Sequence, residues 1–193
     1  MRWGDAFTLQ ASSHTMKTTH PNTKLWKLLA TWIVFLLLHY SYKNFPNTLF
    51  LVIGEKGETN YFHMKMLFFA YCFVTLAEYL LHRKTLTNPA SFVYSRMAIA
   101  VLYPWAATTL WFTAQALGFE IPTFPWEIIY SNIITVISIY FALRLEEVLE
   151  GVEYRASTRQ LITALFLTAI LGYVSFSFNT PQHFFTTPEM HTH

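Results

Sequence analysis

The stretch "QLITALFLTAILGYVSFSF", residues 160–178, contains no Asp, Glu, Lys or Arg. A helix needs about 20 predominantly apolar residues to cross the hydrocarbon core of a bilayer. The length and apolar character of this stretch therefore predict a transmembrane helix.

Four further apolar stretches precede it and are also predicted to span, at residues 28–42, 66–82, 97–119 and 128–143. The first of these, "LLATWIVFLLLHYSY", is short for a span, but Lys27 and Lys43 flank it and their long side chains can reach toward the two interfaces. The third carries Pro104, which predicts a kink. We therefore expect an all-α integral membrane protein with about five transmembrane helices in one domain, residues 25–178.

The composition supports this class. Hydrophobic residues make up 53% of the chain and charged residues 12%, whereas about 25% of an average soluble domain is charged. The net charge of +2 is too small to indicate nucleic-acid binding. The expected surroundings are the lipid bilayer and other membrane subunits, with no nucleic acid. The single cysteine, Cys72, excludes an intramolecular disulfide.

The basic residues predict the orientation of the five spans. Ten Lys and Arg residues fall on the side of the N-terminus and three on the other side, if every stretch spans. Because cytoplasmic loops carry the excess of Lys and Arg, we expect a cytoplasmic N-terminus and an outward-facing C-terminus in a multi-pass protein of the cell membrane. This inference depends on the short first stretch crossing the bilayer.

Three polar regions lie outside the expected spans. Residues 1–24 are polar, with five Thr and two Ser, and we expect a disordered arm rather than a cleavable signal peptide. Met16 would also serve as a translation start. The loop 44–61 contains an apolar stretch too short to span, and it either lies in the interface or folds back on the helices. Residues 179–193 form an expected outward-facing tail that contains His and Met.

Histidines gather on the expected outer side. This group comprises His39, His63, His183, His191 and His193, with Met64, Met66 and Met190 close to them in sequence. Imidazole is a common transition-metal ligand, and imidazole with thioether is a donor set that copper accepts, Cu(I) in particular. The five histidines are therefore candidate metal ligands, with copper as the expected metal. Haem held between His39 and His63 is a second candidate.

A structural explanation of these histidines competes with metal binding. Terminal tails often carry polar residues without a site, and a histidine inside a span often only bonds to a neighbouring helix, as His39 could. The spacing in "HMKM" and "MHTH" matches no fixed metal motif. The residue types and the side of the membrane favour a metal, whereas the spacing does not.

A second group of candidates lies toward the expected cytoplasmic side. Glu78 and His82 share one face of the second predicted helix because they are four residues apart. Ionisable residues within spans are functional candidates, so both are candidate catalytic or proton-handling residues. Glu146, Glu150 and Glu153 share a face that could approach them. Alternatively, Glu78 pairs with His82 or Arg144 as a structural clamp, and the glutamate face is a solvated surface.

Three functions follow from these patterns. The first is a subunit or accessory protein of a membrane complex that binds a metal through the outward-facing His and Met residues. The second is an intramembrane enzyme or proton-coupled carrier centred on Glu78 and His82. The third is a structural or assembly protein without a cofactor. Enzymatic activity is left open by the sequence, which identifies neither substrate nor reaction.

Overall fold

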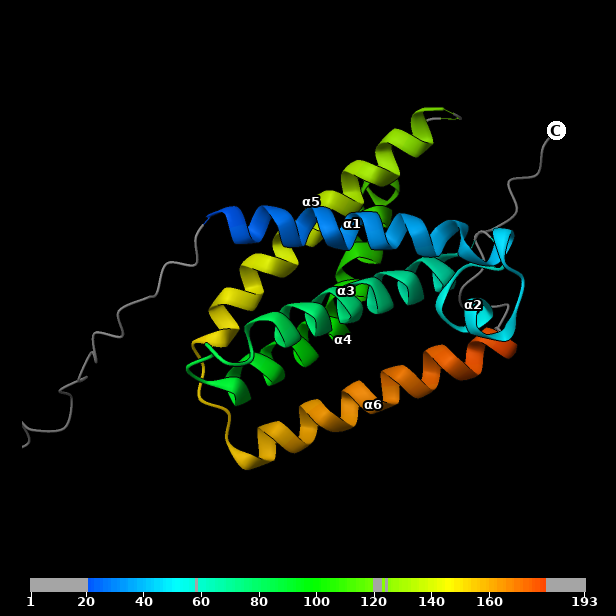
Figure 1. Cartoon of the computed structure of the whole chain (residues 1–193). Helices are drawn as coiled ribbons and strands as arrows, with labels where there is room; N and C mark the ends of the chain where they lie inside the picture. Colours follow the sequence, from blue (N-terminus) through cyan, green and yellow to red (C-terminus); the bar gives the residue numbers. More distant parts are fainter. Residues whose placement is uncertain (1–20, 58, 120–122, 124, 180–193) are drawn as a thin grey trace, which may run out of the picture.

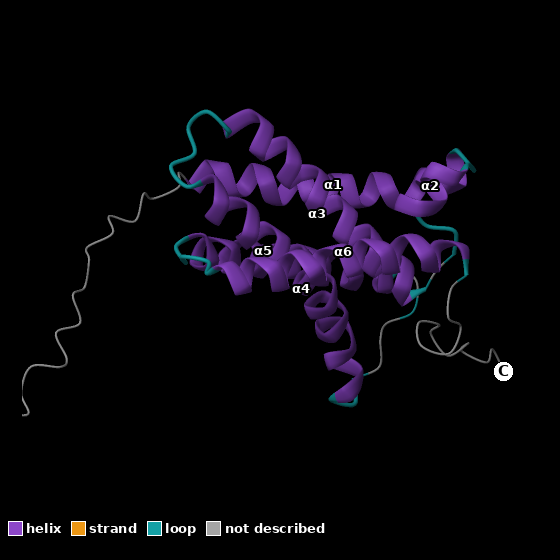
Figure 2. Cartoon of the chain, turned by 90° about the horizontal axis from the view of Figure 1, so that it is seen from below, coloured by secondary structure: helices purple, strands orange, loops and turns teal. Residues whose placement is uncertain are grey.

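The computed structural model describes residues 21–57, 59–119, 123 and 125–179. Within these residues every regular element is a helix (Figures 1 and 2). The helices are α1 (Pro21–Asn44), α2 (Thr48–Ile53), α3 (Asn60–His82), α4 (Pro89–Ala116), α5 (Trp126–Glu150) and α6 (Ala156–Phe178). The N-terminal arm of residues 1–20 and the tail beyond Asn179 lie outside the described residues, and α1 begins inside the region expected to be an arm.

Five of these helices, all except α2, are long and apolar enough to cross a membrane. This confirms the predicted helical class and number of candidate spans. The first is longer than the apolar stretch alone indicated, because the helix continues through both flanking lysines and offers 21 residues from Lys24 to Asn44. Its length is therefore sufficient for a bilayer core of about 20 residues.

Short polar side chains set where several helices begin. The side-chain oxygens of Asn47, Thr59 and Asn88 accept hydrogen bonds from backbone N–H groups three residues further on, at the starts of α2, α3 and α4. Such caps satisfy N–H groups that have no partner inside the helix. In α4, Pro89 follows the cap directly, a position that tolerates its missing N–H. These signals place the loops at both ends of the bundle.

Helix α3 forms the centre of the bundle. It packs against α1 and α4, while α6 lies on α4 and α5 lies on both α1 and α4 (Figure 1). The buried core is rich in aromatic residues, and its members on α3 include Tyr61, Phe62, Phe68 and Tyr71. The short α2 contacts α6, α1 and α3, so the loop 44–61 folds back onto the helices, one of the two expected arrangements.

The last turns of α4 and the first turns of α5 lean out of the bundle together (Figures 1 and 2). The buried residues of α4 end at Ala107, and those of α5 begin at Ser138. In this part of the two helices the Trp111 and Tyr130 rings lie 4.9 Å apart. The candidate sites lie in the packed part of the bundle.

Candidate metal centre and buried ion network

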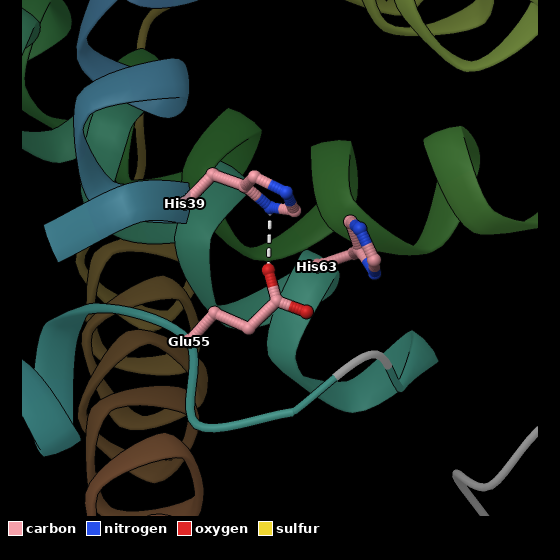
Figure 3. A group of neighbouring side chains, drawn as sticks. All are labelled: His39, Glu55 and His63. Atoms are coloured by element: carbon pink, nitrogen blue, oxygen red, sulfur yellow. Dashed lines mark ion pairs between the residues drawn. The ribbon is translucent and has the colours of Figure 1, made fainter. Parts of the chain in front are cut away.

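Two histidines and a glutamate from three segments meet near the end of the bundle where α1 finishes. His39 lies in the last turns of α1, Glu55 in the loop after α2, and His63 in the first turn of α3 (Figure 3). Each residue offers one potential ligand atom, and these three atoms all lie within 4.8 Å of one another. In Figure 3 the Glu55 carboxylate points toward the His39 ring, with Nδ1 of His39 2.5 Å from Oε2 of Glu55.

A glycine allows the loop to place Glu55 there. A Cβ atom at Gly54 would lie 2.1 Å from Oγ of Ser41 and 2.9 Å from the carbonyl oxygen of Leu38, both on α1. The backbone of Gly54 therefore lies closer to α1 than a residue with a Cβ atom could lie. The N–H of Gly54 also donates to the carbonyl oxygen of Phe50 at 2.9 Å, closing α2. Glu55 follows directly and is buried.

The local hydrogen bonds leave one nitrogen of His63 able to bind a metal. Nδ1 of His63 lies 3.0 Å from the carbonyl oxygen of Thr59. A carbonyl oxygen can only accept, so Nδ1 carries the proton and Nε2 keeps its lone pair. Metal-binding histidines commonly donate their other ring N–H to such a carbonyl, which fixes the ring orientation and the tautomer. Thr59, the N-cap of α3, thus supports the orientation of His63.

The charge of Glu55 also favours a cation at this place. A buried carboxylate is costly unless it is paired or coordinates a metal. Here its closest partner is the imidazole of His39, and the rings of His39 and His63 have centroids only 5.7 Å apart. Two imidazoles and one carboxylate around a shared point form a ligand set found in transition-metal sites.

The sequence candidates for this site are only partly brought together. His39 and His63 lie side by side, as the metal hypothesis requires. His183, His191 and His193 lie outside the described residues, as does Met190. Met64 and Met66 are buried in the hydrophobic core, where they fill space between helices. The described donors are therefore imidazole nitrogens and a carboxylate oxygen.

Sequence reasoning missed Glu55. The loop between the two histidine-bearing helices holds two glutamates, Glu55 and Glu58, and nothing in the one-dimensional pattern selects between them. The available signal was the preceding Gly54, because an isolated glycine often marks a close approach of the backbone to its surroundings. That signal becomes specific only once Ser41 and Leu38 are known to lie against it.

A network of ionised side chains lies near the opposite end of the bundle, where α1 begins. Its centre is Lys27 of α1, whose side chain is only 4% exposed. The Nζ atom donates to Oε2 of Glu78 at 2.5 Å and to both carboxylate oxygens of Glu146, at 2.7 and 2.8 Å. An ammonium has three protons to donate, so all the donors of Lys27 are used. The lysine joins α1 to α3 and α5.

Arg96 of α4 extends the network. Its Nη2 lies 3.0 Å from Oε1 of Glu146, and its Nη1 donates to Oε2 of Glu150 at 2.5 Å. Its guanidinium also lies 3.7 Å from the centroid of the Phe92 ring, a cation–π arrangement. Tyr71 of α3 completes the set, since its hydroxyl donates to Oε2 of Glu146 at 2.5 Å. The four helices α1, α3, α4 and α5 are thereby joined through charged groups.

This network corrects two expectations. Lys27 was expected to extend toward the interface, but its ammonium is buried among carboxylates of neighbouring helices. The arginine next to Glu78 is Arg96 rather than Arg144, which instead pairs with Glu147 at 2.9 Å. Lys27 and Arg96 are buried inside the bundle, where a charged side chain pairs with ionisable groups of other helices. Arg144 is exposed and pairs within its own helix.

His82 takes no part in the carboxylate contacts of the network. Its Nδ1 lies 3.0 Å from the backbone carbonyl oxygen of Glu78, one turn earlier in α3, and the side chain is exposed. Glu146 and Glu150 do approach Glu78 from α5, as their shared helical face indicated. Glu153 lies beyond the end of that helix. Glu78 therefore lies in a cluster with Lys27 and Glu146, and His82 lies outside that cluster; a catalytic or proton-handling role of the two residues stays a prediction.

Comparisons with known proteins find no matching family model, no similar curated protein and no similar solved structure.

Proposed function

We propose that this chain is a metal-binding membrane protein whose centre is formed by His39, Glu55 and His63. The observation that carries the proposal is the meeting of three donors from α1, the α2–α3 loop and α3 within 4.8 Å. Around a metal ion, ligand atoms at about 2.0–2.2 Å are separated by roughly 3.3 Å. A modest closing of the three side chains around the ion would satisfy this geometry.

The donor set favours a divalent ion, and copper(II) is the expected occupant. Carboxylate is a hard ligand and imidazole an intermediate one, a combination that suits Cu²⁺, Zn²⁺ and Fe²⁺ better than Cu⁺. Among divalent first-row metals, copper binds such sites most tightly, and zinc is its main competitor. Three protein ligands also leave a coordination position for water or a substrate, which distinguishes catalytic or transfer sites from closed structural ones.

The same geometry favours a metal ion over haem. A porphyrin between two axial histidines needs a flat clear space extending in every direction around the iron. The carboxylate of Glu55 lies against His39 between α1 and α3, and the Phe35 ring lies 6.3 and 6.4 Å from the centroids of the two imidazoles. Both groups occupy the neighbourhood in which the macrocycle would have to lie.

The location we propose is the outer side of the cell membrane. The positive-inside tendency of the basic residues favours a cytoplasmic location for the end of the bundle where α1 begins, and the metal centre lies at the other end. From there the site would exchange metal with the extracytoplasmic space. We propose that the chain works as a subunit or accessory protein of a membrane complex, which would supply or receive the metal.

Metal analysis of untagged, detergent-purified protein loaded with Cu²⁺ tests the proposal. We expect one tightly bound equivalent. His39→Ala and His63→Ala should each abolish it, and Glu55→Gln should weaken binding at least about tenfold. Circular dichroism and size-exclusion chromatography establish that each variant is folded before metal is measured.

Two control variants separate this centre from other histidines. His82→Ala removes an exposed histidine at the opposite end, and a combined His183→Ala, His191→Ala, His193→Ala variant removes those of the tail. Both should retain the equivalent of copper. If copper binding survives in folded His39→Ala and His63→Ala, or is lost in the tail variant alone, the proposed centre is wrong.

A further inference from the structure

A polar cavity lies at the end of the bundle where α4 and α6 begin. Its volume is about 470 Å³, within the range of about 300–1,000 Å³ that is usual for small-molecule sites. Asn88 and Ser91 line it from the start of α4, and residues 152–155 with Arg159 line it from the α5–α6 connection and the first turn of α6. The α3–α4 and α5–α6 connections lie at the same end of the bundle (Figure 1). The metal centre lies at the other end, so the cavity is a separate site.

Hydrogen bonds fix the walls of this cavity. The buried Oγ of Ser91 lies within hydrogen-bonding distance of the carbonyl oxygens of Glu150 and Val152, the latter at 3.1 Å. This side chain therefore ties the first turn of α4 to the end of α5. The hydroxyl of Tyr154, which is also buried, donates to the carbonyl oxygen of Leu149 at 2.9 Å. Both contacts hold the α5–α6 connection, and with it the cavity, in place.

Arg159 presents an oriented guanidinium group at the cavity. Its Nε donates to the carbonyl oxygen of Tyr154 at 2.8 Å, and the group lies 5.6 Å from the centroid of the Tyr94 ring. A guanidinium has five N–H donors, and within the described residues only the one on Nε is used. Arg159 also forms no ion pair there. The N–H groups that remain form a planar fork, which matches the oxygens of a phosphate.

Arg155 adds a second guanidinium one turn earlier. It is the N-cap of α6, its side chain is exposed, and it forms no ion pair among the residues that the structure describes. Glu153 supplies a carboxylate to the lining, and in the described part of the chain it pairs with neither arginine. The nearby carboxylate of Glu150 is taken by Arg96. Asn88 uses Oδ1 to cap α4, which leaves its amide N–H groups as donors. This lining favours a negatively charged ligand with several acceptor oxygens.

We propose that this cavity binds the phosphate group of an anionic phospholipid. It lies where two candidate spans, α4 and α6, begin, so it would lie at the level of the lipid headgroups. Beyond Arg159, residues 160–178 of α6 contain no Asp, Glu, Lys or Arg, which leaves the two arginines at the border of the apolar segment. Basic pockets between transmembrane helices on the cytoplasmic side bind anionic headgroups, and this is the end for which we propose a cytoplasmic location.

The surroundings favour a lipid over a soluble phosphate. The exposed side chains that follow Arg159 on α6 include Leu161 and Leu165, which are 60% and 48% exposed. They offer an apolar surface along which the acyl chains of a bound lipid can lie. Inorganic phosphate would contact only the polar cavity. A phospholipid is therefore the ligand that uses both the arginines and the apolar surface of α6.

Native mass spectrometry of the full chain in detergent counts the bound lipids. Dioleoyl phosphatidylglycerol is the anionic probe, and dioleoyl phosphatidylcholine is the zwitterionic one. We expect the wild-type protein to retain one phosphatidylglycerol under conditions in which phosphatidylcholine is lost. The double variant Arg155→Gln/Arg159→Gln should lower the affinity for phosphatidylglycerol at least about tenfold, because two charge-assisted contacts to the phosphate are removed.

A matched control removes the same number of charges at the same end of the bundle. Arg83 and Lys84 of the α3–α4 connection are exposed and do not line the cavity, so Arg83→Gln/Lys84→Gln should retain phosphatidylglycerol. Arg155→Gln alone keeps the bond from Arg159 to Tyr154 and should lower the affinity by about two- to fivefold. This single variant keeps the test decisive if the double variant does not fold, which circular dichroism establishes.

Several results would overturn the inference. It fails if phosphatidylcholine binds as tightly as phosphatidylglycerol, if the two double variants lose the lipid equally, or if folded variants of Arg155 and Arg159 bind it as the wild type does. Competition with inorganic phosphate at constant ionic strength distinguishes the source of the phosphate group. Displacement of the lipid by millimolar inorganic phosphate would show a site for soluble anions and would also contradict the lipid assignment.

Discussion

Replacing Lys27 by methionine should unfold the bundle far more readily than any other lysine substitution in α1. The methionine side chain fills a similar space but removes three contacts to carboxylate oxygens, at 2.5, 2.7 and 2.8 Å. Breaking a buried ion pair by removing one partner costs about 3–5 kcal/mol, because the other charge stays buried without compensation. For a chain of this size, about 2–4 °C is lost per kcal/mol, so the thermal midpoint should fall by roughly 6–20 °C.

Circular dichroism melting in one detergent measures this shift. Lys43→Met is the matched control, because it changes the same residue type in the same helix at an exposed position, and its midpoint should stay within about 2 °C of the wild type. The double variant Lys27→Met/Glu146→Gln should recover part of the loss, since it removes a carboxylate together with its cation. If Lys27→Met melts no earlier than Lys43→Met, the lysine is not the central charge that the structure shows.

Two further predictions concern contacts that hold the sites in place. Gly54→Ala introduces a Cβ atom only 2.1 Å from Oγ of Ser41. We expect the free energy of unfolding to fall by about 1–3 kcal/mol and copper binding to weaken. Gly57→Ala is the control, because its Cβ atom meets nothing within 4 Å, and it should change neither property. Equal melting and copper binding of the two variants would refute the tight approach. Trp32→Phe removes the 3.0 Å hydrogen bond from its Nε1 to Oδ1 of Asn132, which joins α1 to α5. The thermal midpoint should fall by an amount equivalent to about 0.6 kcal/mol, and at most about 1.7 kcal/mol, of unfolding free energy. A larger loss would show that the packing of Trp32 contributes more than its hydrogen bond.

The candidate spans could be predicted from the sequence because a bilayer imposes a simple requirement. A stretch such as residues 160–178 must be apolar over about 20 residues, and this can be recognised from the residue types alone, without knowing which helices pack together. The ends of the helices were less predictable. Polar residues extend α1 and α3 beyond their apolar stretches, and α5 continues from Leu143 to Glu150, because charged side chains near a helix end find partners on other helices.

Only some of the residues in the two candidate sites could be predicted from the sequence. His39 and His63 were identified as metal candidates from residue type and expected side, but Glu55 was missed because its position depends on how α2 folds back. Similarly, Glu78 was singled out as an ionisable residue inside a span, whereas its partners Lys27 and Arg96 come from other helices. Sequence spacing reports neighbours on one helix, and it carries no information on which helices pack together.

The most direct test of the metal centre is pulsed electron paramagnetic resonance of the protein loaded with one equivalent of Cu²⁺. The remote nitrogens of coordinated imidazoles give characteristic modulations whose pattern reports how many imidazoles bind. The assignment predicts two coordinated imidazoles in the wild-type protein and loss of the bound-copper signal in His63→Ala. A copper signal without imidazole modulation, or one that His63→Ala leaves unchanged, would contradict the assignment of His39, Glu55 and His63 as the metal ligands.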